Sequence, residues 1–210
     1  MRLTQEQATE NRQRIIETAG RLFRESGFNG VSVADLMKAA GFTHGGFYNH
    51  FPSKEALAAS AALAGLQRSN ATLTETLREQ AGSDHSALWP FIQAYLSSAH
   101  RDNRADGCTI ASLASDAARQ DEQVQASFAQ GIDEELDILA SSFAKTPAQE
   151  QEDMPASARE RAVQLLSELV GAIILARAVA QVNLSLSDEI LEAVSTDLQT
   201  QMKQTTPMNE

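Results

Sequence analysis

Apolar residues recur along this chain with the spacing of an amphipathic α-helix, and the pattern continues from one segment to the next. Within each segment they are separated by three or four residues, so that they fall on one face of a helix and can be buried together. The segments lie at about residues 9–26, 33–40, 43–50, 53–80, 88–96, 109–117, 124–143, 162–174 and 187–198. We therefore predict an all-α protein of about nine helices. Residues 145–156 carry two prolines and no such pattern, which predicts a loop.

Composition supports the helical prediction and narrows the class of protein. The 210 residues contain five prolines and few aromatic residues, at 5%. The single cysteine, Cys108, excludes an internal disulfide framework and suits a reducing compartment. The longest apolar stretch, residues 169–182, contains Arg177 and Gln181 and is too short to span a bilayer. With no apolar run typical of a signal peptide at its start, the chain is expected to be soluble and cytoplasmic.

The segment from residue 31 to residue 57 contains two short helices around a tight turn. Ser32 can cap the first helix, because its hydroxyl can accept a hydrogen bond from a free backbone N–H of the first turn. Gly41 stands where that helix must end, and Thr43 can cap the second one. Pro52 ends the second helix, and Ser53 caps the long helix that follows. Two short helices joined by a turn with glycine are typical of the helix-turn-helix, whose second helix can enter the DNA major groove.

The charge is divided unevenly along the chain. The formal net charge is −11, but residues 1–60 hold seven Lys and Arg against six Asp and Glu, whereas residues 61–210 hold ten against twenty-two. An N-terminal head of this composition can approach phosphate groups, while an acidic body is repelled by them. An acidic solvated surface is the simpler explanation for the body taken alone. The charge distribution is therefore compatible with a DNA-binding head, without demonstrating it.

The N-terminal quarter resembles the DNA-binding head of the tetracycline-repressor (TetR-like) family of bacterial regulators. The resemblance covers roughly residues 10–58 and rests on an ordered series of positions. These are the Gly27–Phe28 turn, Val33 through Ala40, Gly41–Phe42, Phe47-Tyr48-x-x-Phe51 and Lys54-Glu55-Ala56-Leu57. The resemblance implies a dimeric DNA-binding regulator, most often a repressor that a small molecule releases from its operator. It also implies a head of three helices and a larger C-terminal helical domain for ligand binding and dimerisation.

The second helix of the head contains no Lys or Arg, which limits how it can read DNA. Base contacts would then come from Thr43, His44 and Asn49, whose side chains can donate or accept at base edges. The pair Gly45–Gly46 disfavours a helix, and close approach of the backbone to DNA would explain it. Three further residues are predicted to contact phosphate: Tyr48 and Lys54, from matching family positions, and Ser32, which also caps its helix. His50 could contact either a base or a phosphate, and a purely structural role is at least as compatible with its position.

We expect two domains: a helix-turn-helix domain at residues 1–52 and a regulatory and dimerisation domain at residues 53–204, with residues 205–210 as a disordered tail. The last two helices are strongly apolar, and the family dimerises through its last two long helices. The expected interface residues are Leu165, Leu169, Ile173, Ile174, Leu191, Val194 and Leu198. Burial of these residues within one subunit is the alternative.

The resemblance also implies an effector pocket in the body, for which the sequence offers a set of aromatic and apolar residues. They are Trp89, Phe91, Tyr95, Cys108, Leu113, Phe128 and Ile132. Each of them taken alone is more typical of a core residue. Cys108 follows Gly107 at a predicted helix start, where the helix N-terminus favours the thiolate, so a role as an electrophile or oxidation sensor stays open.

The sequence also leaves an alternative function open. The alternative to a ligand-released repressor is a helix-turn-helix regulator controlled by a protein partner or by modification of Cys108, with a packed body and no small-molecule pocket. An enzyme is not expected, because the four histidines and one cysteine lack metal-ligand spacing and no nucleophile motif or phosphate-binding loop is present. We expect no cofactor and no metal. The expected partners are double-stranded operator DNA, a small-molecule effector and a second copy of the chain, without a membrane.

Overall fold

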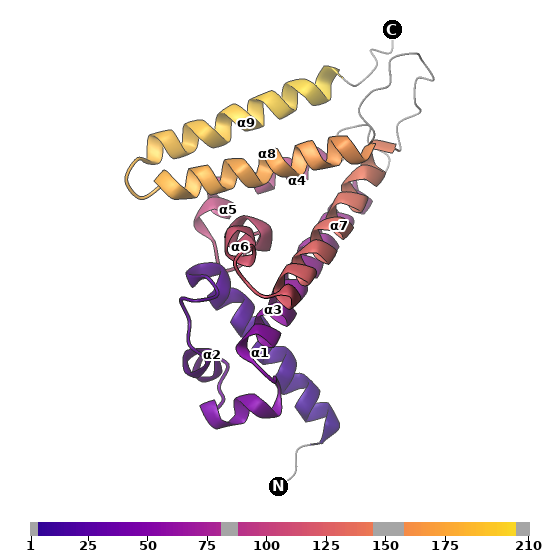
Figure 1. Cartoon of the computed structure of the whole chain (residues 1–210). Coiled ribbons are helices and arrows are strands. Elements are labelled where there is room, and N and C mark those ends of the chain that lie inside the picture. Colours follow the sequence, from indigo (N-terminus) through magenta and orange to yellow (C-terminus); the bar gives the residue numbers. More distant parts are fainter. Residues whose placement is uncertain (1–3, 81–87, 145–157, 205–210) are drawn as a thin grey trace. The chain divides into compact units, whose positions relative to one another are not determined.

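The computed structural model describes residues 4–80, 88–144 and 158–204, and these ranges are helical apart from short connections (Figure 1). They form nine α-helices and one 3-10 helix: α1 (Gln5–Ser26), α2 (Val33–Ala39), η1 (His44–Asn49), α3 (Lys54–Glu79), α4 (Trp89–Tyr95), α5 (Ser98–Asp102), α6 (Thr109–Ala117), α7 (Glu122–Ala144), α8 (Ala158–Val179) and α9 (Leu184–Gln204). The predicted all-α fold is confirmed. The loop predicted at 145–156 and the tail predicted at 205–210 lie outside the described residues.

The chain folds into two compact units, each built from two stretches of sequence. The first unit contains Met1–Ser69 and Arg104–Ile132, and the second contains Asn70–Asn103 and Asp133–Glu210. The helices α3 and α7 begin in the first unit and end in the second. The division into domains at residue 52 stays a prediction.

The core of the first unit is formed by the aromatic and aliphatic faces of α1, α2, η1 and the first half of α3. Its fully buried side chains include Ile15, Phe23, Phe28, Leu36, Met37, Phe47, Phe51, Leu57 and Leu66. The predicted helix ends are confirmed at Gly27 and Gly41, which have φ angles of 75° and 84°. Only glycine adopts this left-handed region cheaply, because it has no Cβ.

The first helix begins earlier than its apolar pattern predicts. A start at about residue 9 was expected, but α1 begins at Gln5 and is capped by Thr4. The Thr4 side chain accepts from Gln7 N, and the Gln7 side chain accepts from Thr4 N, which is a reciprocal capping box. The first turn of α1 is polar because it is exposed, so hydrophobic spacing alone could not locate it.

Two further helices begin with residues that tertiary contacts bury. The helix α6 begins at Thr109, the first residue of the predicted segment; its N-cap is Cys108, and Thr109 is only 1% exposed. The last helix was predicted from residue 187, but α9 begins at Leu184 and contains Ser187 in its first turns. The Ser187 hydroxyl donates to the carbonyl oxygen of Ala176 in α8, so it joins two helices. Capping preferences describe exposed helix ends, and tertiary contacts override them here.

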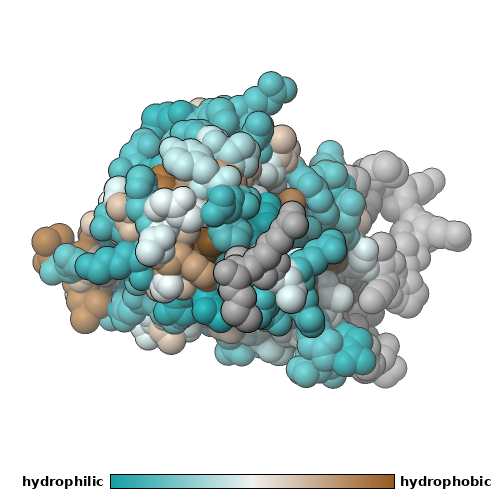
Figure 2. Space-filling model, turned by 90° about the horizontal axis from the view of Figure 1, so that it is seen from below, coloured by the Kyte–Doolittle hydropathy of each residue, from teal (hydrophilic) through white to brown (hydrophobic). Residues whose placement is uncertain are grey.

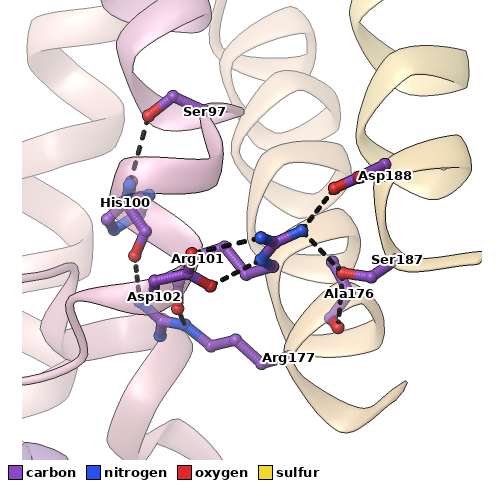
Figure 3. A network of polar contacts seen from close by, with 8 residues as sticks. All are labelled: Ser97, His100, Arg101, Asp102, Ala176, Arg177, Ser187 and Asp188. Carbon is purple, nitrogen blue, oxygen red and sulfur yellow. Dashed lines mark hydrogen bonds and ion pairs between the residues drawn. The ribbon is translucent and has the colours of Figure 1, made fainter. Parts of the chain in front are cut away.

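The second unit is organised around α8 and α9, which lie side by side as an antiparallel pair (Figure 1). The short helix α5, absent from the prediction, packs on α8. A buried network fixes it there (Figure 3). Arg177 of α8 donates from Nε to the carbonyl oxygen of Arg101 at 3.0 Å and from Nη2 to that of His100 at 2.9 Å. Arg101 itself reaches α9, donating to Ser187 Oγ and Asp188 Oδ1.

The helix α8 is longer than its apolar stretch suggested. It has 22 residues and a mean hydropathy of 1.7 over its most apolar window, so by length and composition alone it could cross a membrane. Core helices of soluble proteins have the same properties. In this structure its inner face is buried at Leu165, Leu169 and Ile173, and Arg177 holds α5. We therefore interpret α8 as the central helix of the second unit.

Candidate nucleic-acid interface

The predicted DNA-reading residues are held by an aromatic core directly beneath them. Phe47 of η1 is fully buried and stacks on Phe51 with ring centroids 5.9 Å apart. Phe23 and Phe28 make a second pair, at 5.2 Å. Aromatic pairs at these distances contribute roughly 0.5–1.5 kcal/mol each beyond the area that they bury. A rigid base of this kind fixes the direction of the neighbouring exposed side chains.

The second helix of the helix-turn-helix is a short 3-10 helix, η1, rather than an α-helix. Thr43 is its N-cap residue but makes no side-chain cap hydrogen bond, so this hydroxyl has no role within η1. Thr43, His44 and Asn49 are all exposed, and Tyr48 is 70% exposed with its ring edge against Phe47. Four of the predicted DNA contacts are therefore presented to solvent by one helical turn and its cap.

The glycine pair in η1 is not required by packing within the protein. A Cβ added to Gly45 would meet no atom within 4 Å, and one added to Gly46 would make only ordinary contacts of 3.8–3.9 Å. Neither residue has a positive φ angle. Neither space nor backbone conformation within the protein requires these two glycines, and close approach of η1 to DNA stays the predicted reason for them.

Two other predicted contacts, Ser32 and Lys54, lie at the starts of neighbouring helices. Ser32 caps α2: its Oγ accepts from Asp35 N at 3.2 Å and donates to Asp35 Oδ2 at 2.6 Å. Lys54 is half-buried at the first turn of α3, where Ser53 caps the helix. The pKa of the adjacent Glu55 is lowered, first by hydrogen bonding to its own backbone N–H and then by Ser53. The first turn of α3 therefore already has a negative charge, that of Glu55, beside Lys54. This charge weakens the attraction of Lys54 for a phosphate group.

His50 is placed differently from the other predicted contacts. It is half-buried at the end of η1, and its ring centroid is 6.2 Å from that of Phe42. This packing favours the structural role that the sequence left open, while one edge of the ring stays accessible.

Two arginines of α1 border the same surface and were not among the predicted site residues. The guanidinium of Arg12 lies 4.7 Å from the centroid of Phe51, and that of Arg14 lies 5.9 Å from that of Phe42. Both side chains are exposed. Because they rest on aromatic residues of the head, they can supply the positive charge that η1 lacks. Their sequence signal was weak, since exposed arginines on a helix are usually only solvated.

The predicted effector-pocket residues are divided between the two units. Trp89, Phe91 and Tyr95 lie on α4 in the second unit, whereas Cys108, Leu113, Phe128 and Ile132 lie on α6, its N-cap and α7 in the first. Trp89, Phe91 and Ile132 are half-buried and the other four are buried. Whether any of them contacts a ligand stays a prediction.

The predicted dimer-interface residues are mostly covered within one chain. Leu165, Leu169, Ile173, Leu191 and Leu198 are each at most 6% exposed, and Val194 is half-buried. Ile174 is 42% exposed. The helices α8 and α9 contact each other closely, so their inner faces are already occupied. A partner subunit would have to contact their outer faces.

Two family models match successive parts of the chain. The model described as bacterial regulatory proteins of the tetR family matches residues 15–61, which include α2 and η1. The model described as the C-terminal domain of LmrA/YxaF-like transcriptional regulators matches residues 85–184.

Individual relatives agree with these models. The regulator AcrR of Shigella flexneri is 43% identical over 56 residues, which is 27% of this chain and 26% of AcrR, so this match concerns the head alone. The repressor NemR of Escherichia coli is 25% identical over 138 residues, 64% of this chain and 67% of NemR.

Solved structures show the same fold over almost the whole chain. The reduced form of E. coli NemR has a TM-score of 0.76 at 21% identity, covering 91% of this chain and 96% of NemR. A TetR-family regulator from Cytophaga hutchinsonii also has a TM-score of 0.76 at 21% identity, and the two chains cover each other completely. The helix η1 is exposed above a buried aromatic core, and the two family models match the head and the body of the chain. This chain is therefore a TetR-like, helix-turn-helix, DNA-binding transcriptional regulator.

Proposed function

We propose that this regulator is a dimeric repressor that a small-molecule effector releases from its operator. The observation that carries the effector part is a cavity of about 280 Å³ within the second unit. It is lined by Leu88, Ile92, Phe143, Arg161, Gln164, Leu165, Glu168, Leu198, Gln201 and Met202. Small-molecule sites are typically concave, mostly apolar and supplied with a few polar groups.

The lining combines an apolar floor with two groups of opposite charge. Arg161 lies over the ring of Phe143, 4.4 Å from its centroid. Burial, together with the nearby Asp197, raises the pKa of Glu168. A compact, largely apolar molecule with one polar or charged group fits this lining. None of the seven residues that the sequence suggested for a pocket lies among the lining residues, so the two sets can be tested separately.

Filling the cavity tests the proposal. Gln164 is an exposed lining residue of α8, so Gln164→Phe adds bulk with little cost to the core. A compound that raises the Tm of the wild type and releases operator DNA is expected to lose both effects in this variant. Thr196→Phe, on the exposed face of α9, is the matched control and should keep both. Equal release of the wild type and Gln164→Phe would place the effector elsewhere.

Dimerisation is supported by an apolar outer face that the single chain leaves uncovered. On α8, Val163, Ile174 and Leu175 are 45%, 42% and 58% exposed, and at the turn to α9 Val182 is 88% exposed. Leu184 and Leu186 extend this surface at the start of α9. In Figure 2 hydrophobic residues gather at the left edge, where Figure 1 places the α8–α9 turn. Exposed apolar residues grouped in this way mark interaction surfaces, and a two-fold pairing of this face forms a closed dimer.

The mass of the particle in solution tests this part. Leu175→Glu should convert a dimer into a monomer and abolish tight operator binding, because one head reads only one half-site. The control Gln181→Glu adds the same charge at an exposed position of the α8–α9 turn that is not apolar. A dimer that persists in Leu175→Glu would exclude this face as the interface.

A second candidate function is a regulator whose operator binding is controlled by modification of Cys108, and one observation favours it. Cys108 is the N-cap residue of α6, and its Sγ accepts a hydrogen bond from Ala111 N at 3.5 Å, so modification would break the cap. The relative NemR was solved in a form specified as reduced. The thiol is only 7% exposed, which restricts access. Alkylation with a small electrophile should release operator DNA from the wild type and not from Cys108→Ser; equal release from both would exclude this control.

A further inference from the structure

Arg24 of α1 is a buried arginine with a donor that nothing in the described structure accepts. The side chain is 3% exposed, and its Nε donates to the carbonyl oxygen of Ala105 at 2.6 Å. Its Nη2 is buried and has no hydrogen-bond partner. The nearby carboxylate of Asp106 is bound by Arg21, at 2.6 Å, and no ion pair joins an acid to Arg24 among the described residues. The guanidinium is thus buried without an ion pair of its own among the described residues.

A buried charge in this state is costly unless something else neutralises it. Burial and, to a smaller extent, the neighbouring cation Arg68 together lower the pKa of Arg24 to about 10, while Asp106 opposes the shift. Buried polar groups in native proteins nearly always have partners, and a missing partner often indicates an ion or ligand. Because the unpaired buried charge is positive, the partner that would neutralise it is an anion.

A small cavity lies where such an anion could be held. It has a volume of about 130 Å³, lies between α1 and α3, and belongs entirely to the first unit. It is lined by Gln13, Ile16, Glu17, Gly20, Arg24, Ala61, Ala64, Gly65 and Arg68. Gln13, Glu17 and Arg68 are exposed, so the cavity is reached from solvent along this rim. Four of the lining residues are glycine or alanine, which leaves the space open.

The glycine at position 65 secures the position of the guanidinium. A Cβ on Gly65 would lie 3.1 Å from Arg24 Nη1 and 2.5 Å from Thr109 Oγ1. Any side chain there would therefore displace Arg24 or Thr109. On the other helix, a Cβ on Gly20 would lie 3.4 Å from the same Nη1. The guanidinium therefore lies close to the backbones of both α1 and α3, in space that the two glycines leave free.

One lining residue opposes an anion. Glu17 carries a negative charge at the rim, and its Oε1 accepts a hydrogen bond from Gln13 Nε2 at 2.9 Å. It is exposed, so water screens its charge, whereas Arg24 acts from a buried position where charges are screened less. With two arginines against one carboxylate, the lining is net positive.

We propose that this cavity binds a small oxyanion, such as inorganic phosphate or a carboxylate group, between the Arg24 and Arg68 guanidinium groups. Guanidinium groups bind oxyanions through charge-assisted hydrogen bonds, which are the strong class of hydrogen bond. The bound anion joins α1 to α3 and so stabilises the unit that carries the DNA-reading surface. This site is separate from the proposed effector cavity, and its test does not depend on that proposal.

The test measures the Tm of the full chain while phosphate replaces chloride at constant ionic strength. The wild type should show a saturable rise of roughly 5 °C at a concentration about 100 times the Kd. Phosphate also stabilises proteins generally by exclusion from their surface, an effect that does not saturate. Acetate, in a parallel series, tests whether a carboxylate is bound as well. Titration calorimetry with phosphate should show one site per chain.

Variants separate a bound anion from the general effect. Arg68→Gln removes a charge from the rim and should weaken phosphate binding at least tenfold, and Ala64→Leu should abolish it by filling the cavity. Arg24→Met should lose the phosphate response. Two controls should keep the response: Arg78→Gln, with the same charge change on the same helix, and Thr109→Val, a buried hydroxyl outside the lining. Wild-type behaviour in Arg68→Gln and Ala64→Leu, or no saturable response in the wild type, would overturn the proposal.

Discussion

The guanidinium of Arg177 donates to the carbonyl oxygen of Arg101, so one buried arginine of α8 holds the backbone that carries another (Figure 3). Arg101 in turn binds Asp102 at 2.7 Å and Asp188 of α9 at 2.5 Å. The carbonyls at the end of α5, which a short helix leaves unsatisfied, thereby join α5 to α8, and the Arg101 side chain joins α5 to α9.

Removing Arg177 should destabilise the second unit strongly. In Arg177→Met the carbonyl oxygens of His100 and Arg101 lose a charged donor in a buried setting, and hydrogen bonds to charged groups contribute about 1.5–3 kcal/mol. We expect a loss of about 2–4 kcal/mol in the free energy of unfolding, measured by urea denaturation. Arg78→Met, which breaks an exposed pair with Glu75, should leave the free energy of unfolding almost unchanged. Similar losses in both variants would contradict this interpretation of the network.

Gly45→Ala should separate stability from DNA binding. A Cβ at this position meets no protein atom, and alanine is favoured over glycine in a helix by about 0.5–1 kcal/mol, so the Tm should rise slightly. Operator affinity should fall at least tenfold if the η1 backbone approaches DNA closely, which fluorescence anisotropy would measure. Gly41→Ala is the contrasting variant. Its φ of 84° makes alanine strained, so it should lower the Tm. Unchanged affinity in Gly45→Ala would show that DNA does not approach this face.

Contacts to bases and contacts to phosphate should respond differently to substitution. His44→Ala should change the preferred operator sequence, because an exposed side chain of η1 can reach base edges. Lys54→Ala and Arg14→Gln should weaken binding to all sequences alike and reduce its salt dependence. Selection of binding sites from random DNA, combined with affinity measured against salt, would distinguish the two classes. An unchanged selected motif in His44→Ala would remove its predicted role in readout.

The stability of the chain should fall as pH rises from about 4.5 to about 7, because of Glu135. Its side chain is 3% exposed, its Oε2 has no hydrogen-bond partner, and burial raises its pKa to about 7. The folded state therefore keeps a proton that the unfolded state releases near pH 4.5, and this contribution to stability is lost as pH rises through about 7. Glu135→Gln should be about 2–3 kcal/mol more stable than the wild type at pH 8 and nearly equal at pH 5.

Urea denaturation at the two pH values measures this difference. Glu189→Gln, at an exposed position of α9, should leave the pH dependence unchanged. If the decline in stability persists in Glu135→Gln, another group is responsible for it.

The head of the protein was predictable from sequence because its determinants are local. The caps at Ser32 and Ser53, the glycines that end α1 and α2, and the apolar spacing of Leu36 and Met37 each act over three or four residues. The exposed residues of η1 follow from the burial of Phe47 and Phe51 on either side of them. The 3-10 geometry of η1 was not predictable, since the same pattern suits an α-helix.

The features that the sequence did not reveal depend on residues far apart in the chain. The helix α5 is held in place by Arg177, which lies 76 residues away from Arg101 in the sequence. Arg177 donates hydrogen bonds to two carbonyl groups of α5. Ser187 has the composition of a cap, but it is buried because Ala176 and Arg101 bind it. Leu165 and Leu198 looked suitable for a dimer interface, yet they line a cavity within one chain.

Helical periodicity and capping thus predicted the fold class and the two short helices of the head from the sequence alone, and an ordered series of matching residues carried the family resemblance. Only the tertiary structure decided which apolar faces are covered and which charges lack partners, as for Arg24 and Glu135. The physical reason is that amphipathic spacing shows that a face will be buried but does not specify its neighbour. The helix that packs against a given face decides how far its side chains are buried and which of its charged groups find a partner.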